Sequence, residues 1–176
     1  MGLFLSMASA IGCTKDAVVD RRRAYAEDKQ GALTEAELTT DDDGCLVITE
    51  GTSGATILFP GDFFDWEIAS RFLSRHLDNP IFSFHIHDGD FWMYLLYEKS
   101  AVIDQFNPIP EYWGELDDDE RRPWQGNAFE LVKRVPGLAM ESISKYLVQW
   151  DDELFESDER KKAYPTDKFY YGDDWQ

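Results

Sequence analysis

The sequence predicts an α+β protein, with an antiparallel sheet, two helices on one face of the sheet and a small C-terminal helical extension. Short stretches rich in β-branched and aromatic residues, bounded by turn residues, recur along the first two thirds of the 176 residues. Two helical segments interrupt these stretches, so the order is strand, helix, strands, helix, strands, which is typical of an α+β fold. No sequence period recurs, which excludes a repeat protein.

The elements of the first half are marked by caps and turns. Thr14 is a suitable helix N-cap and Gly31 a suitable end for that helix. The segments DDDG and GTSG predict turns between strands. The expected elements are, in order, a strand at 3–10, a helix at 15–29, strands at 33–38, 45–49 and 55–59, and a helix at 63–77.

The helix at 63–77 is the most amphipathic segment of the chain. Asp62 is its expected cap, and Phe64, Ile68 and Phe72 recur every four residues. This spacing predicts a stripe that packs on the sheet. The stripe is widened by Trp66, Ala69, Leu73 and Leu77.

Three strands are expected next, at 81–87, 91–98 and 101–106. Asp88 and Gly89 lie between the first two, and Asp-Gly is a strong hairpin signal because glycine accepts a positive φ. The strand at 91–98 is apolar at both alternating sets of positions, which predicts a central strand covered on both faces. We expect the C-terminal helices, rather than a partner, to provide the second cover.

The C-terminal third predicts a different organisation. Residues 117–125 are acidic and read as an exposed linker, which divides the chain into a sheet domain at 1–116 and a short-helix extension at 126–176 packed on the same core. Helical patterns are expected at 128–135, 138–148 and 152–162. The aromatic C-terminal tail is expected to dock against the body.

The composition is strongly acidic and limits the classes of partner. The chain has 35 Asp and Glu residues against 17 Lys and Arg residues, a formal net charge of -18. Such a field repels nucleic acid and anionic membranes, and it suits a basic protein partner or plain solubility. No segment approaches the about 20 apolar residues of a transmembrane helix. The two cysteines, Cys13 and Cys45, form no disulfide framework, which favours a reducing, cytoplasmic setting.

The segment FSFHIHDGDFWMY (residues 82–94) carries the candidate metal ligands. His85 and His87 share one face of the expected strand, and Asp88 or Asp90 could add an oxygen ligand. The sequence offers no firm third ligand, so no metal ion is predicted. The favoured interpretation places Ser83, His85 and His87 on the wetter sheet face, with Phe82, Phe84 and Ile86 in the core.

No other catalytic motif is present. The chain has neither a nucleophile elbow nor a glycine-rich phosphate loop, and no cofactor is predicted. Trp92, Tyr112 and Trp113 belong to an aromatic-rich region that would suit protein recognition if part of it stayed exposed among acidic residues. The candidate binding residues are therefore His85, His87, Asp88, Asp90, Trp92, Tyr112 and Trp113.

Part of the chain resembles a family of uncharacterised bacterial proteins. The shared motifs are the hairpin D-x-D-x-W (residues 88–92), F-N-x-x-P-x-Y (106–112) and the terminal G-D-x-W-Q (172–176). The resemblance covers roughly residues 62–176. The family has no known activity, so it implies no role for any residue.

We therefore predict a non-catalytic acidic binding module of the immunity- or adaptor-protein type. The alternative is a metal-binding protein or metal-dependent hydrolase that uses His85 and His87. A third possibility is nucleic-acid mimicry by the acidic surface, and the oligomeric state stays open.

Overall fold

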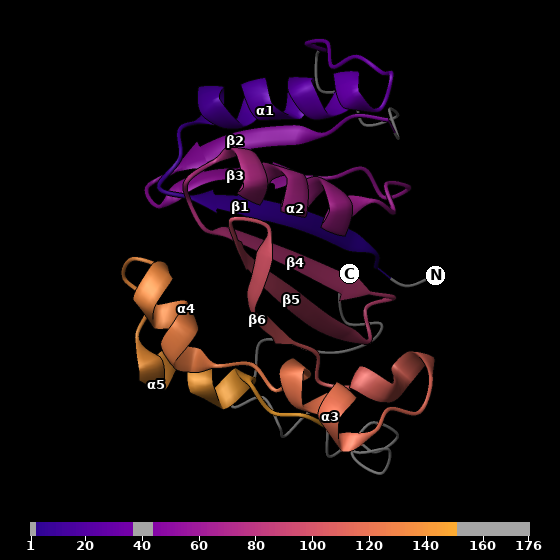
Figure 1. Ribbon diagram of the computed structural model, residues 1–176, viewed down its shortest axis with the longest axis vertical. Coiled ribbons are helices and arrows are strands. Elements are labelled where there is room, and N and C mark those ends of the chain that lie inside the picture. The colour runs from indigo at the N-terminus through magenta and orange to yellow at the C-terminus, as the bar shows by residue number, and fades with distance from the viewer. Residues whose placement is uncertain (1–2, 37–43, 151–176) are drawn as a thin grey trace. The chain divides into compact units, whose positions relative to one another are not determined.

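The computed structural model describes residues 3–36 and 44–150 and contains one six-stranded antiparallel sheet (Figure 1). The strands lie in the order β2-β3-β1-β4-β5-β6. Their bounds are β1 (Leu5–Ile11), β2 (Val47–Gly51), β3 (Gly54–Leu58), β4 (Ile81–His87), β5 (Phe91–Glu98) and β6 (Ala101–Phe106). The predicted α+β class is confirmed.

The chain divides into two compact units. Of the described residues, 5–36, 44–85 and 95–103 form the N-terminal unit, and 3–4, 86–94 and 104–150 form the C-terminal unit. Each unit is described by itself below.

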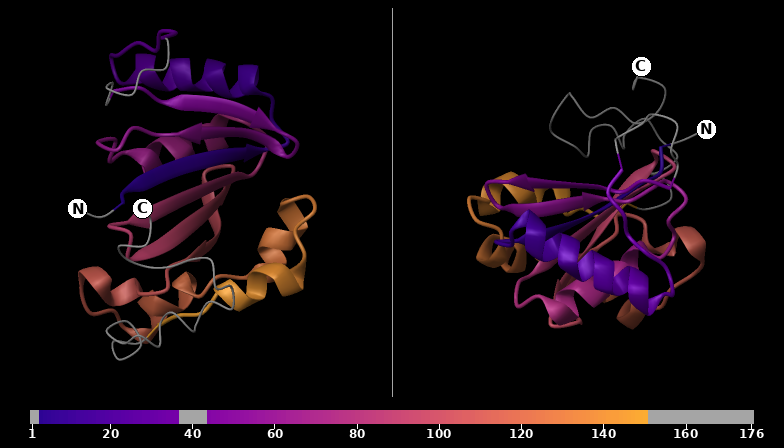
Figure 2. Two further views of the ribbon diagram at one scale, coloured as in Figure 1. Left: turned by 180° about the vertical axis from the view of Figure 1, so that it is seen from behind. Right: turned by 90° about the horizontal axis from the view of Figure 1, so that it is seen from above.

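In the N-terminal unit, two helices pack on the strands. Helix α1 (Lys15–Asp28) contacts β2 and β3, helix α2 (Trp66–His76) contacts β1, and the two helices contact each other. Both lie on the same side of these strands, as the right-hand view of Figure 2 shows. Thr14 caps α1 as predicted, since its hydroxyl accepts the Ala17 N–H at 3.4 Å.

Strands β1 and β3 approach each other so closely at one position that only glycine fits there. Gly54 pairs with Ile11 across β1 and β3 and has a φ of 140°. A Cβ atom on Gly54 would lie 2.1 Å from the Ala10 carbonyl oxygen. No other residue type fits this approach without moving the strand.

The predicted packing stripe of α2 is correct only in part, since Trp66, Ala69 and Leu73 are buried but Phe64 and Ile68 are exposed. The helix starts at Trp66, and its buried residues are Trp66, Ala69, Ser70, Leu73 and Ser74. Phe64 is 85% exposed and Ile68 is 52% exposed. The buried face includes two serines, which a count of apolar residues overlooks. Ser70 is satisfied there because its hydroxyl donates to the Trp66 carbonyl at 2.7 Å and lies 2.9 Å from Ser83 Oγ.

The predicted orientation of β4 is wrong. Ser83 and His85 are buried, whereas Phe82, Phe84 and Ile86 are half-buried. The Ser70–Ser83 hydrogen bond puts this set of β4 side chains under α2. The polar residues therefore face the helix, and the apolar set faces the other way.

Both predicted hairpins on either side of β5 are confirmed with their strand bounds. At the first turn, Asp88 and Gly89 have φ values of 51° and 74°, and the Asp90 N–H donates to the His87 carbonyl at 2.9 Å. At the second, Lys99 and Ser100 have φ values of 50° and 69°. Two successive left-handed residues define a type I′ turn.

Short helices follow in the C-terminal unit. They are η1 (Pro110–Trp113), α3 (Asp118–Arg121), η2 (Arg122–Trp124), α4 (Ala128–Arg134), α5 (Met140–Ile143) and η3 (Ser144–Tyr146). Residues 117–125, expected as a linker, hold α3 and η2, and Asp117 and Glu120 form a complete capping box at α3. The helix expected at 138–148 is divided into α5 and η3, where the Ser142 and Ser144 hydroxyls bind backbone carbonyls.

Three further expectations concern segments that lie partly or wholly outside the described residues. The strand expected at 33–38 is not formed at residues 33–36, and its last two residues lie outside the described ranges. The helix expected at 152–162 and the aromatic tail also lie outside the described residues.

Candidate functional site

His85 is buried against α2 in the N-terminal unit. Its ring stacks on Trp66, with centroids 5.0 Å apart and an interplanar angle of 5°. Its Nδ1 atom lies 2.8 Å from Ser6 Oγ, within a hydrogen bond. Both the face and one nitrogen of the imidazole therefore have protein partners, and the side chain is only 9% exposed. In this setting His85 contributes to packing rather than to a surface.

His87 lies at the centre of an aromatic cluster in the C-terminal unit. The ring centroids of Phe4, Phe91, Tyr112 and Trp113 lie 5.1 to 5.4 Å from that of His87. Phe4, Tyr112 and Trp113 meet the imidazole edge to face, which is a favourable geometry for aromatic pairs. We call these five residues the His87 patch.

Three separate chain segments build the His87 patch. The β4–β5 hairpin supplies His87 and Phe91, and the Gly89 N–H in its turn donates to the Leu3 carbonyl at 2.8 Å, which holds the segment that carries Phe4. Tyr112 and Trp113 come from η1, which begins at Pro110, a residue whose fixed φ suits the first helical position. The positions of the rings are thus set by backbone contacts as well as by ring packing.

The His87 patch is anchored on one side and open to solvent on the other. Phe91 is 1% exposed, whereas Trp113 is 57% and Tyr112 is 38% exposed. Phe91 contacts both exposed rings, at centroid distances of 5.6 and 5.0 Å. Large aromatic side chains therefore stay in solvent with their rings already packed against a buried neighbour.

Acidic residues adjoin the patch along the chain. Asp88 follows His87, Asp90 precedes Phe91 and Glu111 precedes Tyr112. Glu111 forms an ion pair with Arg121, and this hydrogen bond lowers the pKa of the Glu111 carboxyl below its ordinary value. Glu111 is therefore negatively charged near neutral pH, and it also accepts the Leu116 N–H at 3.5 Å.

Trp92 lies apart from the patch residues of its own strand. Successive strand residues point to opposite faces, so Trp92 is directed away from the face of Phe91. Its ring packs against Phe106 at a centroid distance of 4.9 Å and against Tyr94 at 6.3 Å. Trp92 is a half-buried part of this second aromatic group.

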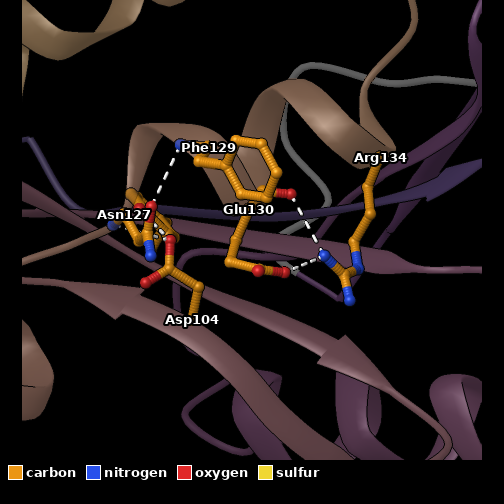
Figure 3. A network of polar contacts seen from close by, with 6 residues as sticks. Asp104, Asn127, Phe129, Glu130 and Arg134 are labelled. Carbon is orange, nitrogen blue, oxygen red and sulfur yellow. Dashed lines mark hydrogen bonds and ion pairs between the residues drawn. The ribbon is translucent and has the colours of Figure 1, made fainter.

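Next to this group, Asp104 of β6 holds the start of α4 (Figure 3). The Tyr94 hydroxyl donates to Asp104 Oδ2 at 2.6 Å, and the Asn127 N–H donates to the same oxygen at 3.0 Å. Burial raises the pKa of the Asp104 carboxyl, although these hydrogen bonds act in the opposite direction. Burial and the hydrogen bond to Asp104 also raise the pKa of Tyr94.

A second glycine is required at this contact. Gly126, immediately before Asn127, has a φ of 72°, and a Cβ atom there would lie 3.0 Å from the Tyr94 hydroxyl oxygen. Tyr94 is fully buried, and the backbone at Gly126 covers its hydroxyl group. The Tyr94–Asp104 pair therefore has a structural role, in which it connects β5, β6 and the start of α4.

Within residues 3–36 and 44–150, no group of three or more His, Cys, Asp and Glu side chains could hold a metal ion. The described part of the chain contains no helix that is both long and apolar enough to cross a membrane. Comparison with protein-family models, with curated proteins and with solved structures gives no match.

The structure brings together three of the candidate residues, His87, Tyr112 and Trp113, with Asp88 and Asp90 on the adjoining turn. It places His85 and Trp92 in other environments. Sequence reasoning missed Phe4 and Phe91 as members of the patch. Phe91 follows the Asp-Gly turn on the face of His87, which could have indicated it, whereas no local signal connects Phe4 with residues more than 80 positions away.

Proposed function

We propose that this protein is a non-catalytic binding module that holds a basic protein partner at the His87 patch. The observation that carries the proposal is the exposure of Tyr112 and Trp113 within a packed cluster of aromatic rings. Single exposed apolar residues are common on protein surfaces, whereas contiguous ones mark interaction sites.

The packing of the cluster favours binding energetically. Tyr112 and Trp113 contact each other, with centroids 5.2 Å apart, and both contact His87 and Phe91. Rings held in this way lose little conformational entropy when a partner covers them. Tyr and Trp also dominate the few residues that contribute most of the binding energy in interfaces.

The charge distribution indicates the kind of partner. The formal net charge is -18, and Asp88 and Asp90 adjoin the patch residues in sequence, whereas the charge of Glu111 is paired with that of Arg121. An acidic field accelerates the approach of a basic protein and disfavours acidic ones. The aromatic rings would then supply contact area, and the surrounding carboxylates would supply specificity and a fast association rate.

A quantitative pull-down tests the proposal. The bait is the full chain, used with lysate of the source cells at low and at high salt. We expect wild type to retain a basic protein at low salt and to lose most of it at high salt, because salt screens exposed charges. Trp113→Ala should weaken the retention by about 30-fold, the effect of losing an interface anchor worth about 2 kcal/mol.

Phe129→Ala is the matched control. Phe129 lies on α4 in the same unit and is 59% exposed, close to the 57% of Trp113, but it is not a member of the patch. We expect this variant to bind as wild type does. Equal retention by Trp113→Ala and Phe129→Ala would contradict the proposal, as would the absence of any protein retained by wild type.

A further inference from the structure

A second apolar surface lies on α2 in the N-terminal unit, where the sequence led us to expect core residues. Phe64, in the turn before α2, is 85% exposed, and Ile68, the third residue of the helix, is 52% exposed. Phe64 and Ile68 are thus two exposed apolar residues at the start of α2. We call them, together with the charged residues Asp62, Asp65, Arg71 and Arg75, the α2 stripe.

The acidic and the basic residues of the α2 stripe lie at opposite ends of it. Asp62, Asp65 and Glu67 lie at its N-terminal end, and Arg71 and Arg75 lie at its C-terminal end. Asp62, Asp65, Arg71 and Arg75 are exposed, and none of them makes an ion pair within 4.0 Å among the described residues, although Arg71 interacts electrostatically with Glu67. Arg71 does lie over the Tyr97 ring, at 5.7 Å from the centroid.

From this arrangement we infer that the α2 stripe is a homodimer contact, in which two copies of the chain pair their α2 helices antiparallel about a two-fold axis near Ile68. An antiparallel pairing places the acidic end of each helix at the height of the basic end of its partner. It also brings Ile68 of one copy against Ile68 of the other. A two-fold interface must be complementary to itself, and this stripe meets that condition.

The same charges make a second copy of the chain a better partner for the α2 stripe than a strongly basic protein. With a net charge of -18, two copies repel each other over most of their surface. The α2 stripe carries two of the chain's 17 basic residues next to its acidic ones, so the local repulsion between copies is small. A strongly basic partner would meet Arg71 and Arg75 unfavourably, and it is better suited by the carboxylates beside the His87 patch.

The contact is small, because α2 contributes only 11 residues. Interfaces of this size are weak and transient, so we expect dimers at protein concentrations on the order of 100 µM. Sedimentation velocity on the full chain over a concentration series should show a shift from monomer to dimer. Ile68→Glu should abolish the shift, and its exposed position allows the fold to be kept.

Charge reversal provides the sharpest test. Arg75→Asp alone and Asp62→Arg alone should each weaken dimerisation by about tenfold, since each sets like charges opposite each other. The double variant should restore dimerisation, because exchanging both charges recreates the complementarity. This rescue would not occur if a different protein occupied the stripe.

The inference is overturned if wild type stays monomeric across the series, or if the double variant dimerises no better than the single ones. Trp113→Ala serves as an independent control, because the His87 patch plays no part in this contact. Its dimerisation should equal that of wild type, and a loss would contradict the assignment to the α2 stripe.

Discussion

Tyr94→Phe removes one buried hydroxyl group and leaves the aromatic ring of Tyr94 in place. This hydroxyl donates to Asp104 Oδ2 at 2.6 Å, and Tyr94 is fully buried. A hydrogen bond to a carboxylate contributes about 1.5–3 kcal/mol. Asp104 keeps the Asn127 N–H at 3.0 Å, so the lost contact does not leave it without a donor. We therefore expect the free energy of unfolding to fall by about 2 kcal/mol.

Urea unfolding followed by tryptophan fluorescence measures this loss. For a chain of this size, the dependence of the unfolding free energy on urea is about 2 kcal/mol/M, so the midpoint should fall by about 1 M. The slope itself should not change, because the variant removes no apolar surface.

Tyr97→Phe is the control for this experiment. Tyr97 is also fully buried on β5, but its hydroxyl has no partner within hydrogen-bonding distance among the described residues, and only a weaker electrostatic interaction with Arg71. Burial raises the pKa of Tyr97 to about 12. Removing a buried hydroxyl without a close partner should change stability by less than about 0.5 kcal/mol or increase it. If the two variants lose the same stability, the reasoning about Tyr94 and Asp104 is refuted.

Two further changes test local features of the fold. Lys99→Asn with Ser100→Gly should stabilise the protein by about 0.5–1 kcal/mol in thermal unfolding, because Asn-Gly suits the left-handed φ values of this turn; a loss of stability would contradict the type I′ assignment. Asp104→Asn should change the pH dependence of stability. Burial raises the folded-state pKa of Asp104, so its protonated form stabilises the fold below pH 3.8, and this contribution is lost as the pH rises through the higher folded-state value. As the pH rises through this range, the unfolding free energy of wild type should therefore fall relative to that of Asp104→Asn. A difference between the two that does not change with pH would count against a buried carboxylate at position 104.

Local signals in the sequence were sufficient for the strands and turns from β4 to β6. The three strands from β4 to β6 follow from an Asp-Gly turn and from short apolar runs, and both kinds of signal act between neighbouring residues. The position of α1 follows from Thr14 in the same way. Features of this type need no knowledge of the tertiary structure.

The buried face of α2 could be inferred only in part in this way, and that of β4 could not. The buried side of α2 includes Ser70 and Ser74, and that of β4 includes Ser83 and His85. These polar residues are tolerated because they find partners in elements far along the chain, such as Ser6 for His85. Apolar periodicity cannot detect such partners, so it assigned Phe64 and Ile68 to the core.

Only the part of the candidate site that is local in sequence could be predicted. His87 and its neighbouring aspartates form a local motif, and Tyr112 and Trp113 stand out as a pair of large aromatic residues. Their contact depends on how η1 meets the β4–β5 hairpin, and the contribution of Phe4 depends on the pairing of Leu3 with Gly89. Only the folded structure supplies these relations.

Site-specific photocrosslinking in the source cells tests the central claim most directly. A photoreactive phenylalanine analogue is placed at position 113, within the His87 patch, or at position 129, which is equally exposed and outside it. If the patch binds a basic protein, position 113 should give one dominant crosslinked product that contains such a protein, and position 129 should not. The account is contradicted if position 113 gives no product beyond the pattern at position 129.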